Sequence, residues 1–575
     1  MGSLGEYSVP QEAEAVFQNG ILNNPLMKDL PGDLKSLSQH VKFEGSSKPS
    51  VPINWRFAES ISALKAFEAT MLIRLLQKKY KTEPVDVTIN TDHASLFYFS
   101  PLIAQLIGKD GKFTPMALMS LLPEAMAMFP EEDKHRSTAS LHRALVTNMY
   151  KTKDGRYYQV HGGINPDPTL SALELPADGQ PEDTYDSVVE RFQNAISQID
   201  STDLDDLLNE KHRQAGTVAL SSDEYFASEH GQASGKVGLY EIAKDTNSTQ
   251  PASWWPENDT LPSSPKRPLA GLKIVDLTRI IAGPVVSRGL AELGASVMRV
   301  TSANITDMSS LHQDVNWGKW NCHLDLTNEG DKEKLRALIR DADVVVDGYR
   351  PGAMEKHGFG REDIFNLVSG RERGIIHLRE NCYGWYGPWK NRGGWQQISD
   401  ACCGVSLAYG KAMGLDEAVT PAFPNSDYCA GVSGSTAVLD ALMKRAENGG
   451  SYGVDISLNY YSQWLVRSCG TYPDQVWKEM WARHGSPVFR HFHTMAYNVP
   501  VMSTLLQQYD TETLFQPQFF EARVSKAVDG TFMVVKPVAQ FSNNAVELRY
   551  NVGTRGNGVD QPVWPADLSV EVVQK

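Results

Sequence analysis

The sequence predicts an α/β protein built on a doubly wound, parallel, Rossmann-like sheet. Between residues 268 and 382, strand candidates alternate with helix candidates, and the strands are short apolar runs without regular polar alternation. Such runs are typical of strands buried on both faces, and their alternation with helices favours parallel pairing. In a sheet of this kind the ligand crevice lies beyond the carboxyl ends of the strands, so function is expected in the loops that follow them.

Four strands are expected in chain order, each with a helix between it and the next. The strand candidates are GLKIVDLT (271–278), ASVMRVT (295–301), DADVVVDGY (341–349) and GIIHLRENC (374–382). The loops that follow carboxyl ends, and are therefore candidates for function, include TRIIAGP, DGYRPGAM and ENCYGWYGP. A further turn, strand and helix are expected over 449–470, and a strand pair over 522–539.

Five regions are predicted along the chain. The segment FAESISALKAFEATMLIRLLQKKY (57–80) has apolar residues at helical spacing and predicts one long amphipathic helix. The stretch 246–267 is crowded with Pro, Ser, Thr and Asn and predicts a linker, although its two tryptophans indicate that it packs along a surface. The regions are an irregular lead-in (1–50), an N-terminal region (51–245), the linker (246–267), the main domain (268–470) and a C-terminal segment (471–575).

The stretch from Thr420 to Leu442 is the centre of the main domain. It predicts a short loop that holds Asp427, followed by a helix in which Gly431 and Gly434 allow close backbone approach. A carboxylate at a helix N-terminus is stabilised in its ionised form and can act as a nucleophile. A helix-capping role is the commoner use of such an aspartate, so position alone does not identify a catalytic residue.

Composition excludes several classes of function. With 55 Lys and Arg against 69 Asp and Glu, the net charge is −14, which argues against nucleic-acid and anionic-membrane binding. No apolar run is long enough to span a bilayer and no targeting signal is recognised, so a cytoplasmic location is expected. The six cysteines form no CxxC pattern, and the HFH at 491–493 lacks an acidic or cysteine companion in the sequence, so no metal site is predicted.

Several motifs occur together in a recognisable order. They are PLAGLKIVDLTRIIAGP, ELGASVMRV, NWGKWNCHLDL, GYRPGAMEKHGFG, CYGWYGPW and SDYCAG followed by a small-residue helix. From about Pro268 to about Leu465 the chain therefore resembles the family III CoA-transferases, the CaiB/BaiF group. The resemblance implies that family's fold, with an additional smaller α+β domain. Ordinary members form interlocked ring dimers, so this longer chain is expected either to form a homodimer likewise or to supply part of that partner itself.

The resemblance also implies a reaction and its nucleophile. Asp427 occupies the position of the residue that attacks an acyl-CoA thioester, becomes an aspartyl-CoA thioester and passes CoA to a free carboxylic acid. Coenzyme A and acyl-CoA are then substrates, and no permanently bound cofactor is expected. Carried over position by position, the CoA site comprises Ile281, Ala282, Leu324, Asp325, Gly348, Tyr349, Arg350 and Lys356, with Arg279, Arg299 and Lys319 as lesser candidates.

Departures from the family pattern keep two alternatives open. Acyl-CoA racemases of this group use a histidine and an aspartate where this chain has Trp395 and Gln396, which argues against racemisation, and Asp400 nearby is read as structural. The stretch TSANITD lacks arginines that many members carry, and no GGGG loop is found. Residues 51–245 resemble a degenerate copy without a nucleophile. An acyl-CoA racemase and a non-catalytic acyl-CoA-binding protein therefore remain as alternatives to the transferase.

Overall fold

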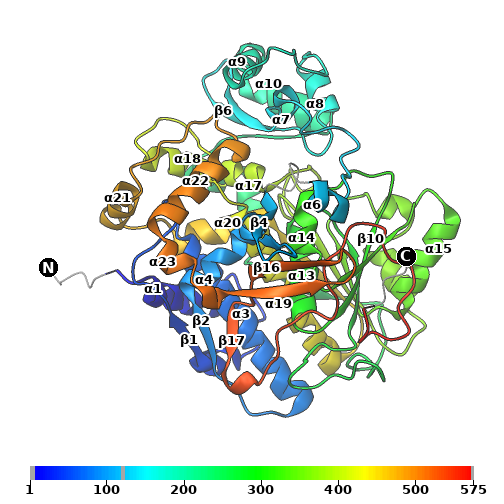
Figure 1. The fold of residues 1–575 in the computed structure, drawn as a ribbon. Coiled ribbons are helices and arrows are strands. Elements are labelled where there is room, and N and C mark those ends of the chain that lie inside the picture. The colour runs from blue at the N-terminus through cyan, green and yellow to red at the C-terminus, as the bar shows by residue number, and fades with distance from the viewer. Residues whose placement is uncertain (1–6, 118–122, 572–575) are drawn as a thin grey trace.

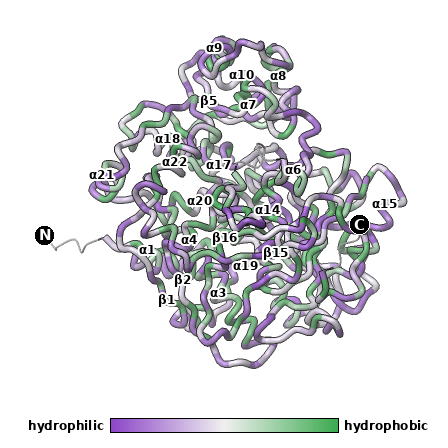
Figure 2. Tube along the Cα trace, in the orientation of Figure 1, coloured by the Kyte–Doolittle hydropathy of each residue, from purple (hydrophilic) through white to green (hydrophobic). Residues whose placement is uncertain are grey.

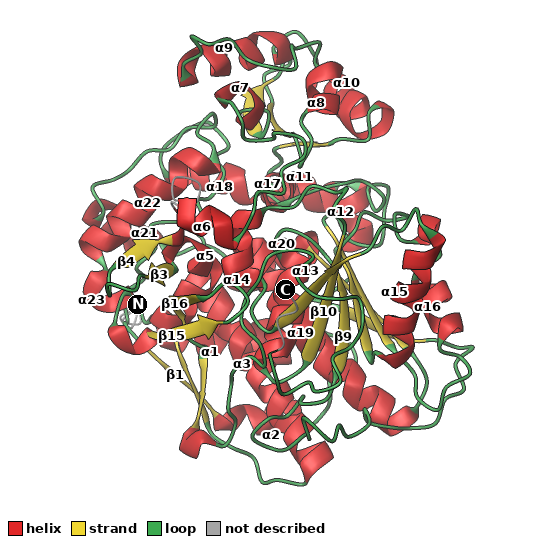
Figure 3. Cartoon of the chain, turned by 45° about the vertical axis from the view of Figure 1, so that its right-hand side comes forward, coloured by secondary structure: helices red, strands yellow, loops and turns green. Residues whose placement is uncertain are grey.

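A seven-stranded sheet forms the centre of the computed structural model, which describes residues 7–117 and 123–571 (Figure 3). The strand order is β11-β10-β9-β12-β13-β14-β8; β8 runs antiparallel to β14 and the other strands pair in parallel. The strands are β8 (Glu241–Lys244), β9 (Lys273–Leu277), β10 (Ser296–Thr301), β11 (Lys319–His323), β12 (Val344–Asp347), β13 (Ile376–Asn381) and β14 (Tyr452–Ser457).

The order of these strands reverses direction once, and the place where it reverses is called the topological switch point of the sheet. Chain order runs from β9 outward through β10 to β11, and then returns to place β12 on the other side of β9. This is the order of a doubly wound sheet, in which the loops after the first and fourth strands separate and leave a crevice. The predicted α/β class and mainly parallel sheet are confirmed, and the strand order puts the switch point between the ends of β9 and β12.

Helices cover both faces of the sheet. α13 (Ala282–Glu292) and α19 (Asn425–Asn448) pack on the face formed by Ile274, Val346 and Leu378, whereas α15 (Glu329–Asp341) and α16 (Arg361–Leu367) cover the opposite face. Figure 2 shows hydrophobic positions gathered along the inner elements and hydrophilic ones along outer turns, for example near α15 and α21 (Asp474–Arg483). The strands are apolar because both of their faces are covered.

The strand β11 was not predicted, and its composition explains why. Its residues KWNCH alternate polar and apolar, which does not resemble a run buried on both faces. Lys319 is nevertheless fully buried, and its ammonium lies 2.9 Å from Asp276 Oδ2 and 2.8 Å from the Pro284 carbonyl oxygen. A buried ion pair thus allows a polar strand at this edge of the sheet.

Helix α3 (Phe57–Leu75) is where predicted, but it is not amphipathic. Every residue from Phe57 to Leu75 is buried, because the helix packs against α19, α1 (Val9–Ala15) and α4 (Thr91–Ser95). Its polar residues have partners within the helix and from other elements; Lys65 Nζ lies 2.7 Å from Glu68 Oε2, and Ser435 of α19 donates to Glu68. The helical spacing predicts this helix correctly. The polar side chains predict a solvent-exposed face, but they are buried against other parts of the protein.

Segments from the two ends of the chain share sheets. β2 (Val87–Asn90) pairs with β17 (Ala539–Phe541), and β3 (Gln105–Ile107) pairs with β16 (Gly530–Val535). These sheets also contain β1 (Val41–Glu44), β4 (Phe113–Pro115) and β15 (Phe520–Ser525). The predicted five-region division stays a prediction, but strand pairing crosses its boundaries.

A small unit of both helices and strands stands at the top of Figure 1. Its antiparallel sheet contains β5 (Asn148–Lys151), β6 (Tyr157–His161) and β7 (Ala215–Val218), and its helices are α7 (Leu141–Ala144), α8 (Asp167–Ala172), α9 (Tyr185–Ile196) and α10 (Ser201–Asp205). β6 and β7 contact α17 (Gln396–Cys402) of the main body. The unit therefore adjoins the loops that follow the central strands.

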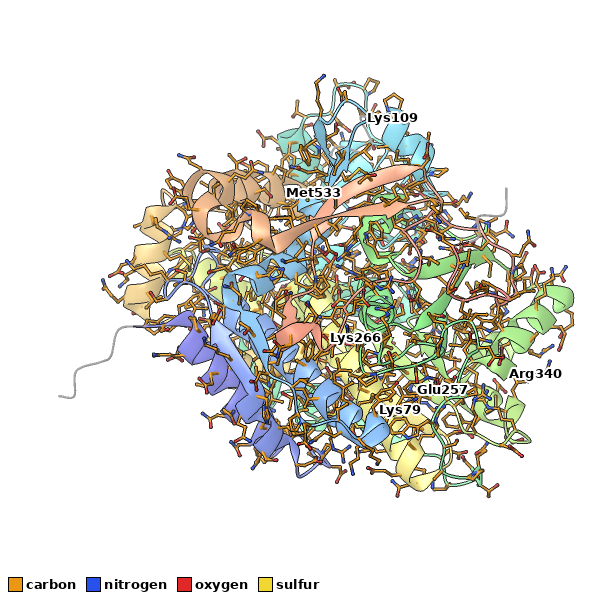
Figure 4. All side chains as sticks on the ribbon, turned by 60° about the horizontal axis from the view of Figure 1, so that its bottom comes forward. Lys79, Lys109, Glu257, Lys266, Arg340 and Met533 are labelled. Atoms are coloured by element: carbon orange, nitrogen blue, oxygen red, sulfur yellow. The ribbon has the colours of Figure 1, made fainter. Side chains whose placement is uncertain are left out.

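The predicted linker is packed. Lys79 Nζ donates to Glu257 Oε1 at 2.9 Å, a pair labelled in Figure 4, and it lies 4.5 Å from the ring centroid of Trp255. Trp255 itself is buried and donates to the Ala270 carbonyl oxygen at 3.0 Å. The tryptophans hold this stretch against the body, as the sequence indicated.

The remaining α-helices complete the fold. They are α2 (Leu34–Leu37), α5 (Ser100–Ile103), α6 (Pro123–Met128), α11 (Ser222–Ala227), α12 (Glu229–Ser234), α14 (His312–Val315), α18 (Val405–Ala412), α20 (Leu458–Trp464), α22 (Met495–Tyr509) and α23 (Thr511–Leu514). In the described part of the chain, none of the helices combines the length and apolar character that a membrane crossing requires.

Candidate active site

Asp427 lies in the first turn of α19. The helix begins at Asn425, after Pro424, so the residue is inside the helix and not in a loop before it. Within the part of the chain that the structure describes, no hydrogen bond or ion pair engages its carboxylate, which therefore caps nothing. The adjacent Tyr428 hydroxyl donates to Asp314 at 2.7 Å, and Asp314 pairs with Arg288 of α13 at 2.6 Å. The turn is anchored while the Asp427 carboxylate stays unpaired.

Two glycines set the position of this turn. A Cβ on Gly431 would lie 2.5 Å from Val285 Cγ1 and 3.1 Å from the Ala282 carbonyl oxygen, at the start of α13. A Cβ on Gly434 would lie 2.9 Å from Ile456 Cδ1 and 3.4 Å from Leu378 Cδ1 in the sheet. Only glycine allows this approach. The predicted close packing is present and brings Asp427 beside the loop that follows β9.

Acidic side chains, and not basic ones, surround Asp427. Burial raises the pKa of Asp427 to about 7. The Asp427 charge in turn contributes to raised pKa values at Glu380, at the end of β13, and at Asp400 in α17, where burial is the larger cause. Asp400 accepts a hydrogen bond from Gln396. An uncompensated acidic group at this position indicates function more than stability.

Three predicted contacts meet at the switch point. Ile281 and Ala282 begin α13 directly after β9, and Gly348 follows β12. A Cβ on Gly348 would lie 3.3 Å from Thr278 Cγ2 in the loop after β9 and 3.7 Å from Glu380 Oε2. Since Gly431 packs on Ala282, the loops after β9, β12 and β13 converge with the first turn of α19.

Tyr349 and Arg350 lie beside two further arginines. The Arg279 guanidinium lies 5.0 Å from the Tyr349 ring centroid, and Arg350 donates to the Arg213 carbonyl oxygen at 3.1 Å. Burial, and then the charges of Arg279 and Arg213, lower the pKa of Arg350. Within the described residues, none of the ion pairs includes Arg213, Arg279 or Arg350. We call these three residues the arginine cluster; unpaired cations of this kind attract phosphate.

The other predicted contacts lie farther along the same edge. Leu324 and Asp325 follow β11, where the Leu324 side chain is buried and the Asp325 carboxylate accepts from Thr327 at 2.7 Å. Lys356 is exposed in a helical turn, Glu355–His357. These positions are on the expected edge, and their contact with CoA stays a prediction.

Two of the lesser candidates cannot reach a ligand. Arg299 is fully buried and donates to Asp307 at 2.7 Å and to the Thr278 carbonyl oxygen at 3.2 Å, and Lys319 is buried against Asp276. Both were expected to be available cations because a sequence does not show which charges are paired internally. Arg299 and Lys319 instead hold the chain after β9 in place, through their hydrogen bonds to the carbonyl oxygens of Thr278 and Pro284.

Sequence reasoning missed three residues of this site. Glu380 opens the flagged loop ENCYGWYGP but was not singled out, and Arg213 comes from the small unit, where nothing in the sequence pointed to it. His161 stacks on Trp395 with ring centroids 5.0 Å apart, and burial lowers its pKa to about 3. A neutral histidine from a distant segment thus lies beside the position where racemases carry theirs.

Other cavities and clusters lie away from this site. One cavity of about 450 Å³ is lined by Lys28, Tyr240 and Lys444 near the end of α19, and another of about 470 Å³ by Phe113, Phe515 and Met533. Among described residues, no group of three His, Cys, Asp or Glu could hold a metal ion. His491 does have an acidic companion, Glu417 at 2.8 Å, which the sequence did not reveal.

Sequence comparisons with known proteins identify one family. The sequence profile of CoA-transferase family III matches residues 269–498. The chain is 61% identical to the acetyl-coenzyme A transferase nodX of Hypoxylon pulicicidum, over 100% of this chain and 96% of that protein. It is 31% identical to an acyl-CoA transferase of Gibberella moniliformis, over 79% of this chain and 78% of that protein. The crystal structure of Rv3272 from Mycobacterium tuberculosis overlaps 35% of this chain and 57% of that chain, with 29% identity and a TM-score of 0.31.

Proposed function

This chain belongs to CoA-transferase family III and is a CoA-transferase, and on that premise we propose that it moves CoA between an acyl-CoA and a free carboxylic acid through an aspartyl-CoA thioester on Asp427. The observation that carries the proposal is the unpaired carboxylate of Asp427, fixed at the switch point by the close packing of α19 on α13. A carboxylate used only for capping or ion pairing would have a partner.

The reaction follows from the nucleophile. An oxygen of ionised Asp427 attacks the thioester carbonyl carbon, the carbon–sulfur bond breaks, and CoA leaves as a thiolate. The thiolate then attacks the aspartyl carbonyl of the mixed anhydride, which gives aspartyl-CoA and releases the free acid. A second acid reverses these steps. The helix N-terminus favours the ionised nucleophile while burial disfavours it, so the raised pKa of about 7 leaves both forms populated near neutral pH.

The arginine cluster supports a place for the phosphates of CoA. Arg279 and Arg350 follow β9 and β12 at the switch point, and Arg213 extends from the small unit. Guanidinium groups without acidic partners offer charge-assisted hydrogen bonds to phosphate oxygens. Ile281, Ala282, Gly348 and Tyr349 would then line the path toward Asp427. Leu324, Asp325 and Lys356 remain proposed contacts on the outer part of the same edge.

The relatives suggest the substrate class. One is named an acetyl-coenzyme A transferase and the other an acyl-CoA transferase, so acetyl-CoA is the first substrate to test. We keep the family's homodimer as part of the proposal. Racemisation is the less favoured reaction, because His161 is stacked on Trp395 and its Nδ1 accepts the Gly163 N–H at 2.9 Å.

Exchange of labelled acetate into acetyl-CoA tests the function without knowledge of the natural acceptor. Wild type should form labelled acetyl-CoA because the free acid re-enters through aspartyl-CoA. Asp427→Ala and Asp427→Asn should lose at least about 10³-fold in this exchange, since neither variant has a nucleophilic carboxylate. Asp416→Asn, at an exposed position, is the matched control and should keep full activity.

The same samples separate the alternatives. In heavy water, a transferase leaves the α-hydrogens of the acyl group in place, whereas a racemase replaces them with deuterium. Undiminished exchange in Asp427→Ala would disprove the proposed nucleophile. Deuterium incorporation that depends on Asp427, without acetate exchange, would favour racemisation.

A further inference from the structure

Glu380 occupies a defined place opposite Asp427. In β13, residues 376, 378 and 380 point to one face of the sheet, because side chains alternate along a strand. Leu378 Cδ1 lies 3.4 Å from the Cβ position of Gly434, so this face is the one that α19 covers. Glu380 is two residues farther toward the carboxyl edge, and Asp427 is two helical turns before Gly434 in the same direction. Both side chains therefore reach the edge where the loops converge.

The Glu380 carboxyl group has no basic partner among the described residues. No hydrogen bond or ion pair in the described ranges engages it, and its Oε2 would lie 3.7 Å from a Cβ on Gly348. The charges that act on it are those of Asp427 from α19 and of Asp347 at the end of β12, and its own charge acts on the Cys382 thiol just after β13. Arg379 points to the opposite face, where its Nε lies 2.8 Å from Asp455 Oδ1.

Protonation is the consequence of this environment. Burial, followed by the negative charges of Asp427 and Asp347, raises the pKa of Glu380 to about 8. Two ionised carboxylates without a cation between them repel each other, so the site holds fewer charges than carboxyl groups near neutral pH. A protonated carboxyl group is a hydrogen-bond donor, which ionised Glu380 would not be.

We propose that Glu380 is a hydrogen-bond donor to the reacting acyl group, stabilising the oxygen that becomes negative when Asp427 attacks the thioester. This inference rests on the proposed function of Asp427. As the new carbon–oxygen bond forms, the carbonyl electron pair moves to the acyl oxygen, which accepts the hydrogen bond from the neutral carboxyl group. When the carbon–sulfur bond breaks, the pair returns, and the Glu380 proton never leaves its oxygen. The step needs no further reactant.

Two substitutions distinguish a hydrogen-bond donor at position 380 from a side chain that only fills space there. Glu380→Gln keeps a neutral donor of the same length, whereas Glu380→Ala removes it. In the acetate–acetyl-CoA exchange, Glu380→Ala should lower kcat by about 10²-fold with little change in KM, as for loss of one oxyanion donor. Glu380→Gln should stay within about fivefold of wild type. Glu362→Gln, exposed on α16, is the matched control.

The pH profile gives a readout that a structural role would not move. Because the donor form of Glu380 is lost as pH rises through about 8, the kcat of wild type should fall above that pH. Glu380→Gln cannot ionise and should keep its kcat up to pH 9. Thermal melting of each variant checks folding, and Glu380→Gln should melt no lower than wild type at pH 8, because it removes a partly buried acid that has no basic partner among the described residues.

Two results would overturn the inference. One is a Glu380→Ala enzyme within threefold of wild type; the other is a Glu380→Gln enzyme as slow as Glu380→Ala, or with the wild-type fall above pH 8. If wild type still forms aspartyl-CoA, either result rejects only the role of Glu380 and leaves the proposed function in place. Absence of aspartyl-CoA in wild type would instead reject the function on which the inference rests.

Discussion

Unpaired charges of opposite sign lie at the switch point of the sheet. Among the residues that the structure describes, Asp427 and Glu380 have no basic partner and the arginine cluster has no acidic one. An apoprotein with such uncompensated charges is less stable than one in which they are paired. The arrangement is explained if the phosphates of CoA bind the arginines and its thioester reaches Asp427.

Arg350→Ala should weaken CoA binding without stopping the chemistry. Loss of one charge-assisted contact to phosphate is worth about 1.5–3 kcal/mol, so KM for acetyl-CoA should rise about 10- to 100-fold while kcat changes little. Arg213→Ala should act in the same direction, which would show that the small unit takes part in binding. Steady-state kinetics at low and high salt measure both effects.

Arg340→Ala provides the control for the arginine substitutions. Arg340 lies at the outer edge of the molecule on α15, pairs with Glu333 at 2.6 Å, and is labelled in Figure 4. Its removal should leave KM unchanged. An Arg350→Ala enzyme with the same KM as this control would place the phosphates of CoA elsewhere.

Helix α19 joins the site to the core. It is buried between α13, α3 and the sheet, and its glycines let its first turn touch the loop after β9. The position of Asp427 therefore depends on packing at residues that never meet substrate. A change in this packing would displace the helix as a rigid body and move the Asp427 carboxylate with it, but it would leave the chemistry of the carboxylate unchanged. An effect on kcat would then come from the position of the nucleophile and not from its reactivity.

Gly431→Ala tests this dependence. Alanine is the better helix former, but its Cβ would lie 2.5 Å from Val285 Cγ1, so we expect a net loss of about 1–3 kcal/mol of unfolding free energy. The transferase kcat should fall as well, because the first turn is displaced. Urea unfolding and the exchange assay measure the two effects. Gly370→Ala, where a Cβ meets nothing within 4 Å, should be neutral in both; equal behaviour of the two variants would refute the packing argument.

Helices and strands could be predicted from sequence where the pattern of polar and apolar residues agrees with the burial of the element in the structure. The apolar strands β9, β10, β12 and β13 were expected, as was the small-residue helix behind Asp427. β11 was missed and α3 was misread as amphipathic, because Lys319, Glu59 and Glu68 are buried polar residues whose partners come from other segments. The same reason explains Arg299, a predicted ligand contact that is an internal support.

At the scale of the whole molecule, the chain is interleaved. β8 extends the central sheet from before the linker, and β16 and β17 from the C-terminal segment pair with β3 and β2. Partners of this kind are separated by hundreds of residues, and no local pattern specifies them, so the sequence suggested regions in series where the structure has shared sheets. Arg213 and His161 reach the site for the same reason.

A cut in the linker should therefore not divide the protein. A protease site inserted between Pro265 and Lys266 can be cleaved in the folded enzyme, and denaturing gels will show complete cleavage. The two pieces should still elute together in size-exclusion chromatography and keep exchange activity, because three sheets contain strands from both sides of the cut. Separation of the fragments in native buffer would mean that each side folds alone.

The central claim is that Asp427 becomes covalently joined to CoA, and the most direct measurement is mass spectrometry of the intact protein mixed with acetyl-CoA, followed by hydroxylamine treatment and peptide mapping. We predict a CoA-sized mass increase that hydroxylamine removes, leaving a hydroxamate on the peptide that carries Asp427. Glu380→Gln should form the same adduct, and Asp427→Asn should form none. CoA binding without an adduct in wild type, or an adduct on another residue, would contradict the account.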